Sequence, residues 1–418
     1  MRKPIIQKLI GREILDSRGN PTLEVATILC DGTVGLCAVP AGASRGQYEA
    51  IERRDGDPAR YGGLGVTAAA RSVREIFSPL LCGMNAAENQ RIDRRLLAAD
   101  GTAQKEKYGG NTLLGVSLSV ARAAAAFYRL PLYRYLGGAA ARRLPVPMMN
   151  LINGGAHAAN RLDIQEFMVV PVGAPSFREA LRWGSEIRRA LGKLLSDAGY
   201  ATGVGDEGGF APDLPDERAA LDFLMAAVAA AGYENKGVKI ALDIASSEWT
   251  AEDGLYHLPK EGSSLTREAL TARLSALIAD YPILSLEDPL GEEDFEGWAG
   301  LTGTLGDRVT LVGDDLFVTD PARLAHGIRA GAANAVLVKP NQNGTLSGTL
   351  SFAEKAQKAG YRVILSHRSG ETEDTTVADL AVAVGAPFIK AGAPCRGERV
   401  AKYNRLLRIE ETLTGVTV

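Results

Sequence analysis

The sequence predicts an α/β protein in which an irregular eight-stranded β/α barrel follows a smaller α+β domain. Short runs rich in Val, Ile and Leu recur through the second half of the chain, and segments of helical length separate them. Most of these runs end in a charged or polar residue, as at 363–365, which Ser366 and His367 follow directly. Because the chemistry of a parallel barrel lies at the C-terminal ends of its strands, we expect an active site on one rim of this barrel.

Composition limits the class of protein. The 418 residues suffice for two or three ordinary domains, and 46% hydrophobic with 23% charged residues is typical of a soluble globular protein. The net charge is −3, and the basic residues are scattered among acidic ones. This balance gives no reason to expect nucleic acid or a membrane surface as a partner, so we expect a small-molecule substrate.

The cysteines and the N-terminus favour the cytoplasm. The four cysteines have no CxxC spacing, which suits a reducing compartment, and we interpret them as small buried apolar residues. Residues 5–9 resemble a strand rather than a signal sequence, and no apolar run reaches the length that spans a membrane.

Residues 1–138 are expected to form the smaller domain. Alternating residues predict an antiparallel meander with a turn at Asp31 and Gly32, and its strands are expected at 5–10, 22–29 and 33–39. The Gly-rich segment 40–46 predicts a mobile loop of the kind that closes over a ligand. Apolar residues at helical spacing then predict helices at 68–81, 87–99 and 113–128. Gly137, Gly138 and two nearby prolines mark the boundary to the barrel domain, 139–418.

The barrel is expected to begin with an antiparallel pair of strands. The candidates at 147–152 and 164–170 are separated by only about a dozen residues, too few for a helical crossover between parallel strands. A long helix is predicted over 176–198, and six further strand candidates follow. They begin at Val238, Ile283, Val309, Ala335, Val363 and Pro387. Two and six strands together complete an eight-stranded barrel.

Three acids, Asp243, Glu287 and Asp314, end successive strand candidates. Converging carboxylates repel one another unless a cation lies between them, and an all-oxygen set favours a hard ion such as Mg²⁺. Any one of these acids alone would be better explained as a helix cap. Three in succession favour a metal site, and we expect the following residues, Asp288 and Asp315, to be the caps.

Cationic residues end the remaining strands. Lys339 and Lys390 each follow an apolar run, which is unusual for a surface lysine, and we expect neighbouring cations to lower the pKa of such a lysine as a general base requires. His367, Arg368 and Ser369 together provide donors suited to a phosphate group.

Two acidic segments and a histidine are ambiguous on their own. Gln165 and Glu166 begin a strand candidate, and Glu207 lies in a glycine-rich segment where a carboxylate can approach a ligand closely. Taken alone, each acid is more typical of a turn. His157, on a Gly-rich loop, is by itself more typical of a polar surface.

Longer motifs resolve this ambiguity by resemblance. Segments 205–212 (GDEGGFAP), 163–167 (DIQEF) and 366–372 (SHRSGET) are similar to those of the enolase family, as are 311–319 and 399–404. The resemblance covers essentially the whole chain. It implies an enolase-type (β/α)8 barrel of ββαα(βα)6 order with an N-terminal cap domain.

The resemblance also implies a reaction: the reversible, Mg²⁺-dependent dehydration of 2-phosphoglycerate to phosphoenolpyruvate in glycolysis, with two Mg²⁺ per active site. Lys339 would be the base that removes the C2 proton, and Glu207, supported by Glu166, the acid that protonates the leaving hydroxyl. Lys390 would stabilise the aci-carboxylate intermediate. Other residues that the motifs imply are the ligands of the first Mg²⁺ (Asp243, Glu287 and Asp314), a ligand of the second (Ser44), phosphate-binding residues (Arg368, Ser369 and Ser44) and pocket residues (Gln165, His157 and His367). Enolases are commonly homodimers, and we expect one here.

The chain departs from the family pattern in several loops. Segment 41–46 (AGASRG) has Arg45 where Thr is usual, and Asn343 replaces an apolar residue after the predicted base. These changes leave open an enolase-like enzyme of a specialised pathway, acting on a modified phosphoglycerate such as a phosphonate or a carboxyphosphonoenolpyruvate-type compound. A non-catalytic protein on the same scaffold is a third hypothesis, which the predicted acid and base disfavour.

Overall fold

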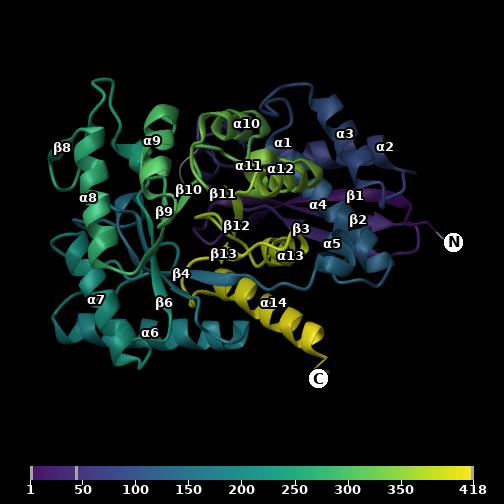
Figure 1. Cartoon of the computed structure of the whole chain (residues 1–418). Helices are drawn as coiled ribbons and strands as arrows, with labels where there is room; N and C mark the ends of the chain where they lie inside the picture. The colour runs from purple at the N-terminus through teal and green to yellow at the C-terminus, as the bar shows by residue number, and fades with distance from the viewer. Residues whose placement is uncertain (1–2, 43–45, 416–418) are drawn as a thin grey trace.

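The computed structural model describes residues 3–42 and 46–415. A barrel domain and a cap domain lie side by side, and the C-terminal helix runs along the barrel (Figure 1).

The cap domain begins with the predicted meander. Strands β1 (Ile6–Leu15), β2 (Pro21–Leu29) and β3 (Val34–Ala38) form an antiparallel sheet in that order. Helix α4 (Gly110–Phe127) packs on this sheet, with most of its residues buried. At Gly35 a Cβ atom would lie only 2.2 Å from backbone atoms of α4, so this glycine permits the close approach of sheet and helix.

The remaining cap helices lie close to where the sequence predicts them. The segment predicted at 68–81 is one helical stretch interrupted by a π-helical turn, with the parts α1 (Thr67–Ser72), η2 (Val73–Phe77) and α2 (Ser78–Leu81). Helices α3 (Asn89–Asp100) and α5 (Leu132–Gly137) complete the domain, together with the short 3-10 turns η1 (Tyr61–Gly63) and η3 (Gly138–Ala140).

The second domain is a closed eight-stranded barrel. Its strand order is β10-β11-β12-β13-β4-β5-β6-β9. Strand β5 pairs antiparallel with both of its neighbours, and the other pairs are parallel. The predicted irregular barrel with an antiparallel first pair is therefore confirmed. The strands are β4 (Val146–Asn153), β5 (Glu166–Pro171), β6 (Val238–Asp243), β9 (Ile283–Glu287), β10 (Thr310–Gly313), β11 (Ala335–Val338), β12 (Arg362–Ser366) and β13 (Phe388–Lys390).

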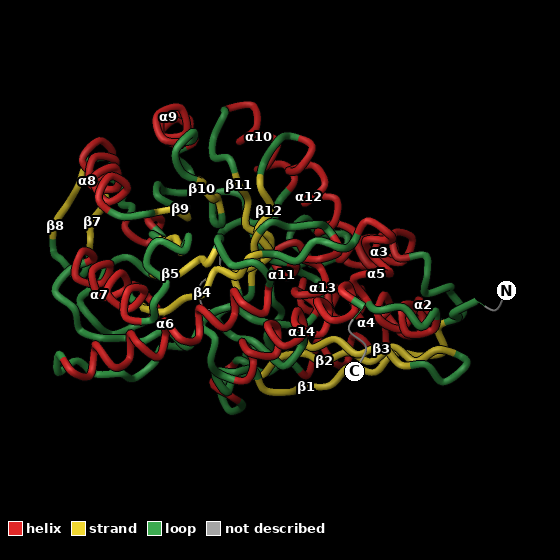
Figure 2. Tube along the Cα trace, turned by 60° about the horizontal axis from the view of Figure 1, so that its bottom comes forward, coloured by secondary structure: helices red, strands yellow, loops and turns green. Residues whose placement is uncertain are grey.

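Helices surround the barrel strands, as Figure 2 shows. They are α6 (Phe177–Asp197), α7 (Glu217–Ala230), α8 (Arg267–Asp280), α9 (Phe295–Leu305), α10 (Pro321–Ala330), α11 (Pro340–Asn343), α12 (Leu346–Lys358), α13 (Thr376–Ala383) and α14 (Gly397–Thr414). Short 3-10 turns lie at η4 (Gly155–His157) and η5 (Ser246–Trp249). The side chains of Asp294 and Asp320 cap α9 and α10. The prediction that Asp288 and Asp315 are these caps is wrong, because both helices begin several residues later.

A small hairpin was not expected from the sequence. Strands β7 (Tyr256–Leu258) and β8 (Ser263–Leu265) form a separate two-stranded sheet between β6 and α8. This insertion accounts for the long spacing between the rim acids Asp243 and Glu287.

Apolar side chains fill the barrel and hold its rim in place. The interior cluster comprises Met148, Met168, Val170, Ala241, Val312, Ala335, Leu337 and Ile364. Larger clusters join the strands to the outer helices and fill the cap domain. A close-packed core of this kind gives the strand ends fixed positions.

Within the described residues, no single helix is both long and apolar enough to cross a membrane. Among the described helices, one pair, Gly110–Phe127 and Leu132–Ala140, is long and apolar enough when taken together, but it is bent by 93°.

Candidate active site

The C-terminal ends of the barrel strands bring the predicted residues to one rim. Asp243, Glu287 and Lys390 are the last residues of β6, β9 and β13, and Asp314, Lys339 and His367 directly follow β10, β11 and β12. Glu166 joins them because β5 runs antiparallel, so its first residue lies beside the last residue of β6. All of these side chains except Glu287 line a small cavity of about 50 Å³.

Lys390 neutralises much of the acidic rim. Its ammonium group lies 2.9 Å from Asp243 Oδ2, 2.8 Å from Glu287 Oε1 and 3.0 Å from Glu166 Oε1. Burial lowers the pKa of Lys390, but the three carboxylates outweigh burial and hold this pKa well above its ordinary value. Lys390 therefore stays an ammonium ion in this environment.

The carboxylates of Asp243, Glu287 and Asp314, here called the acid set, include an oxygen that has no hydrogen-bond partner among the described residues. Glu287 Oε2 is buried and has no hydrogen-bond partner among the described residues. Burial and the nearby Asp243 carboxylate raise the pKa of Glu287 well above its ordinary range. A buried, unpartnered oxygen beside two further carboxylates fits a hard divalent cation. Asp243, Glu287 and Asp314 are thus suited to hold Mg²⁺, and Gln165 Nε2, 3.2 Å from Asp243 Oδ2, orients one of these oxygens.

Asp288 has a structural role beside this set. Its carboxylate accepts the backbone N–H groups of Asp314 at 3.0 Å and Asp315 at 2.8 Å. It thereby shapes the turn that presents Asp314 at the rim. Carboxylate oxygens of Asp288, Asp314 and Asp315 lie within 4.8 Å of one another, so they form a second acidic group that could hold a cation. Burial and the Asp314 carboxylate raise the pKa of Asp315 to about 8.

Lys339 forms an ion pair with Asp314. Burial lowers the pKa of Lys339, as do Arg368 and Lys390, but Asp314 outweighs them and the pKa is raised overall. The expectation of a lowered pKa is therefore wrong for this arrangement, because sequence spacing did not show that a carboxylate contacts the amine directly.

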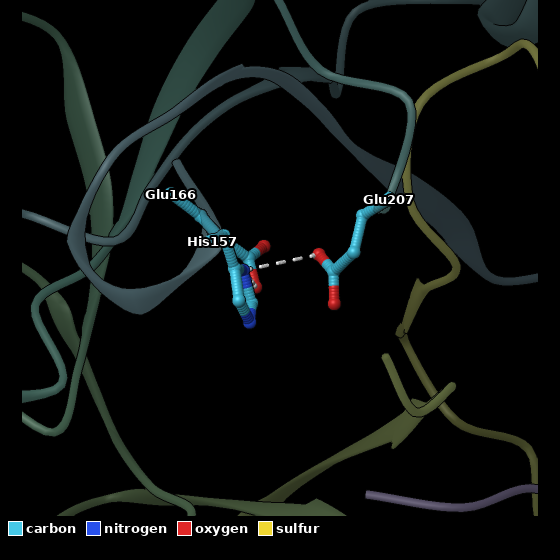
Figure 3. Close-up of side chains that lie close together, drawn as sticks. All are labelled: His157, Glu166 and Glu207. Carbon is cyan, nitrogen blue, oxygen red and sulfur yellow. Dashed lines mark ion pairs between the residues drawn. The ribbon is translucent and has the colours of Figure 1, made fainter. Parts of the chain in front are cut away.

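Glu166, Glu207 and His157 meet on the other side of the cavity. Figure 3 shows the Glu207 carboxyl group directed toward His157 and Glu166. His157 Nδ1 lies 3.8 Å from Glu207 Oε2 and 3.9 Å from Glu166 Oε1. Both acids are almost wholly buried and line the pocket; Glu207 does lie in a turn, whereas Glu166 is the first residue of β5.

The pKa values of the two glutamates are shifted in opposite directions. Burial and the Glu207 carboxylate raise the pKa of Glu166 well above its ordinary value. Burial also raises the pKa of Glu207, but the positive charges around it, those of Arg399 and Lys390 among them, outweigh burial, and the net shift is well downward. These opposite shifts favour the proton of the pair on Glu166 rather than on Glu207.

Two further contacts hold Glu207. Asn150 Nδ2 lies 3.2 Å from its Oε2, and His367 Nε2 lies 3.5 Å from its Oε1. Asn150 could not be predicted from the sequence, because an asparagine inside an apolar strand has no distinctive spacing. The antiparallel pairing of β4 and β5 and the return of the 205–209 segment bring it to the acid.

Arg368 and Ser369 line the same pocket, close to the cap domain. Arg368 forms a buried ion pair with Glu49, whose oxygens lie 2.9 and 3.3 Å from the guanidinium nitrogens. Gln342 Nε2 lies 3.2 Å from both Glu49 Oε1 and Asp314 Oδ1. Glu49 could not be predicted from the sequence, because its role depends on contact between the two domains.

Of the two loops that depart from the family pattern, the one around Asn343 lies within the described residues. Asn343 donates to Thr319 O at 3.3 Å and accepts from Thr345 Oγ1 at 3.1 Å, and it does not line the pocket. The predicted ligand Ser44 and its neighbour Arg45 lie outside the described residues.

The fold and the rim together define a barrel enzyme with an acidic cation site, a lysine and a carboxyl pair on opposite sides of one pocket, and an arginine for an anion. Comparison with known sequences agrees with this class. The family model described as the N-terminal domain of enolase matches residues 6–136, and the one described as the C-terminal TIM barrel domain of enolase matches residues 141–418.

Curated relatives cover nearly the whole chain. Proteins named enolase are 55% identical in Beutenbergia cavernae (99% of this chain, 97% of the relative), 56% in Mycobacteroides abscessus (98% and 95%) and 54% in Mycobacterium leprae (98% and 95%). The chain belongs to the enolase family and is a lyase, as the sequence motifs predict.

Proposed function

We propose that this enzyme catalyses the reversible, Mg²⁺-dependent dehydration of 2-phosphoglycerate to phosphoenolpyruvate. The observation that supports this most directly is that Lys339 and the Glu166–Glu207 pair line one pocket with Asp243, Asp314 and Arg368. Removing a proton from C2 and a hydroxyl from C3 requires a base and an acid on either side of the substrate, and this arrangement provides both.

Lys339 is the proposed base. Its ammonium group must leave the ion pair with Asp314 and release a proton to solvent before the neutral amine can accept the C2 proton. Mg²⁺ held by Asp243, Glu287 and Asp314, with a second ion for which the motif implies Ser44 as a ligand, would supply positive charge that stabilises the charge developing on the substrate carboxylate. Lys390, an ammonium ion here, adds to that stabilisation because it lies within the same acid set.

Glu207 is the proposed acid for the departing hydroxyl. Because Glu166 holds the proton of the pair when no substrate is bound, we infer that this proton reaches Glu207 before the hydroxyl leaves. His157 lies beside both carboxyl groups and lines the substrate pocket, as do Gln165 and His367. Arg368 and Ser369 are the proposed phosphate ligands, together with Ser44, which the sequence motif implies.

Formation of phosphoenolpyruvate from 2-phosphoglycerate, measured with Mg²⁺ and with a chelator, tests this proposal. We expect fast turnover that the chelator abolishes and Mg²⁺ restores. Folded, Mg²⁺-loaded protein that leaves 2-phosphoglycerate unchanged would contradict it.

The same assay addresses the alternative functions. A specialised enzyme would prefer a phosphonate analogue over 2-phosphoglycerate, whereas a non-catalytic scaffold would turn over neither. The position of Asn343 outside the pocket supports the ordinary substrate. A homodimeric, cytoplasmic enzyme of glycolysis is part of this proposal and can be checked by light scattering and cell fractionation.

A further inference from the structure

Arg399 is a wholly buried arginine near the start of α14 that reaches the acid side of the pocket. Its Nη1 atom lies 2.7 Å from His367 Nδ1. The guanidinium also donates to the backbone carbonyls of Asp206, Arg368 and Ser369. One side chain therefore contacts the segments that present Glu207, the histidine beside it and the anion-binding pair.

Space for this arginine depends on Gly392. Its φ angle is +79°, and a Cβ atom there would lie 2.8 Å from Glu207 O and 2.9 Å from Arg399 Cδ. A side chain at position 392 would displace the arginine stem or the acid segment. The backbone after Lys390 thus keeps Arg399 in contact with its partners.

The contact with His367 determines which ring nitrogen bears the proton. A guanidinium group has five N–H donors and cannot accept a hydrogen bond. His367 Nδ1 must therefore be the acceptor, and in the neutral ring the proton lies on Nε2. That nitrogen faces Glu207 Oε1 at 3.5 Å. Burial and the positive charge of Arg399 hold the pKa of His367 well below its ordinary value, and this favours the neutral ring.

We propose that Arg399 is a positioning residue that fixes His367 as the Nε2–H tautomer, so that the imidazole donates to Glu207 and does not act as a base. The geometry of Arg399, His367 and Glu207 carries this assignment. Its consequence for turnover rests on the proposed function, because Glu207 is the acid only in that reaction. A histidine that donates to the ionised acid steadies its position, and a histidine with the other tautomer would turn a lone pair toward the carboxylate.

The first test is a measurement of the tautomer, which does not depend on any substrate. The chain has only four histidines, so long-range ¹H–¹⁵N correlation spectra of histidine-labelled protein can be assigned with His367→Gln. We expect His367 to be neutral with the proton on Nε2, and Arg399→Met, which removes the donors beside Nδ1, to produce a mixture of tautomers. A proton on Nδ1 in the unchanged protein, or an unaltered tautomer in Arg399→Met, would overturn the proposal.

The second test measures catalysis. Arg399→Lys should lower kcat for dehydration by about tenfold or more, the usual scale for groups that orient an active-site histidine, while C2 proton exchange is affected less. His367→Gln should lower dehydration too, and the double variant should lose little beyond the larger single effect. Fully multiplicative losses, or an equal loss of exchange and dehydration, would contradict a role through His367.

A matched control separates positioning from folding. Arg405 lies on the same helix and holds Asp379 through two hydrogen bonds of 2.8 and 2.6 Å, away from the pocket. Arg405→Lys should leave the His367 tautomer and the ratio of exchange to dehydration unchanged. If the unchanged protein does not turn over 2-phosphoglycerate, the proposed function fails, whereas the tautomer measurement still decides the role of Arg399.

Discussion

Glu49 and Arg368 form a buried ion pair between the cap domain and the barrel rim. Removal of one partner from such a pair leaves an uncompensated buried charge. The resulting loss of folding free energy is larger than the net stabilisation that the intact pair provides. The same guanidinium is the proposed phosphate ligand. At the scale of single residues, Glu49 therefore determines how Arg368 is held when no phosphate is present.

Glu49→Ala should lower the free energy of unfolding by about 3 kcal/mol. Inorganic phosphate should restore more stability to this variant than to the unchanged protein, because an anion can replace the missing carboxylate beside Arg368. Denaturant titrations with and without phosphate measure both effects. Glu293→Ala, which removes an exposed partner of Arg323, is the control and should cost little. Equal stabilisation by phosphate in both proteins would count against this account of Arg368.

Single residues of the site are harder to predict from the sequence than the elements that carry them. The residue types at the strand ends could be predicted, because an apolar run that ends in a charged residue is visible in one dimension. Glu49, Asn150 and Arg399 could not, because each acts across a contact between segments far apart in the chain. The raised pKa of Lys339 was missed for the same reason, since it depends on the direct contact with Asp314.

At the scale of elements, the β7–β8 hairpin holds the loop that bears His157. Lys260 Nζ donates to Gly155 O and Ala158 O, both at 2.7 Å. In return, Asp163 accepts the backbone N–H groups of Lys260 and Glu261 at 2.9 Å. The hairpin thus binds the loop on both sides of His157.

Lys260→Met should release this loop and lower kcat by about tenfold, because a displaced group near the reacting atoms is costly even without a change of chemistry. The effect should largely disappear in a His157→Ala background, which steady-state kinetics of the single and double variants would measure. Lys236→Met, which removes a lysine that lies over Tyr233, is the control. Independent, multiplicative effects of the two changes would show that Lys260 does not act through His157.

The elements also show where a periodic pattern is sufficient. Eight strands, the antiparallel first pair and the long helix α6 follow from run lengths and spacing, so they could be predicted. The β7–β8 hairpin could not, because its strands have three residues each and no long alternation. The caps were misplaced because Asp288 and Asp315 precede the helices by several residues, and Asp288 instead ties the ends of β9 and β10.

At the scale of the whole molecule, the barrel concentrates buried acids whose negative charge a cation can neutralise. Glu287 and Glu166 each have a raised pKa, and Lys390 is shared among three carboxylates. A cation that binds the folded rim and not the unfolded chain must stabilise the fold by mass action.

Mg²⁺ in large excess over its dissociation constant should therefore raise the free energy of unfolding, by about 2.7 kcal/mol at a hundredfold excess. Thermal unfolding with Mg²⁺ and with chelator measures this. Glu287→Gln should abolish most of the gain, whereas Glu354→Gln, on an exposed ion pair, should keep it. Equal gains in both variants would place the stabilising cation elsewhere.

Lys339 is proposed as the base and Glu207 as the acid, and one comparison of two variants tests this assignment most directly. Exchange of the C2 proton of 2-phosphoglycerate with solvent deuterium should be followed together with phosphoenolpyruvate formation. We expect Lys339→Ala to abolish both, and Glu207→Gln to abolish phosphoenolpyruvate formation while C2 exchange continues. Exchange retained by Lys339→Ala, or lost in Glu207→Gln, would contradict the assignment of base and acid.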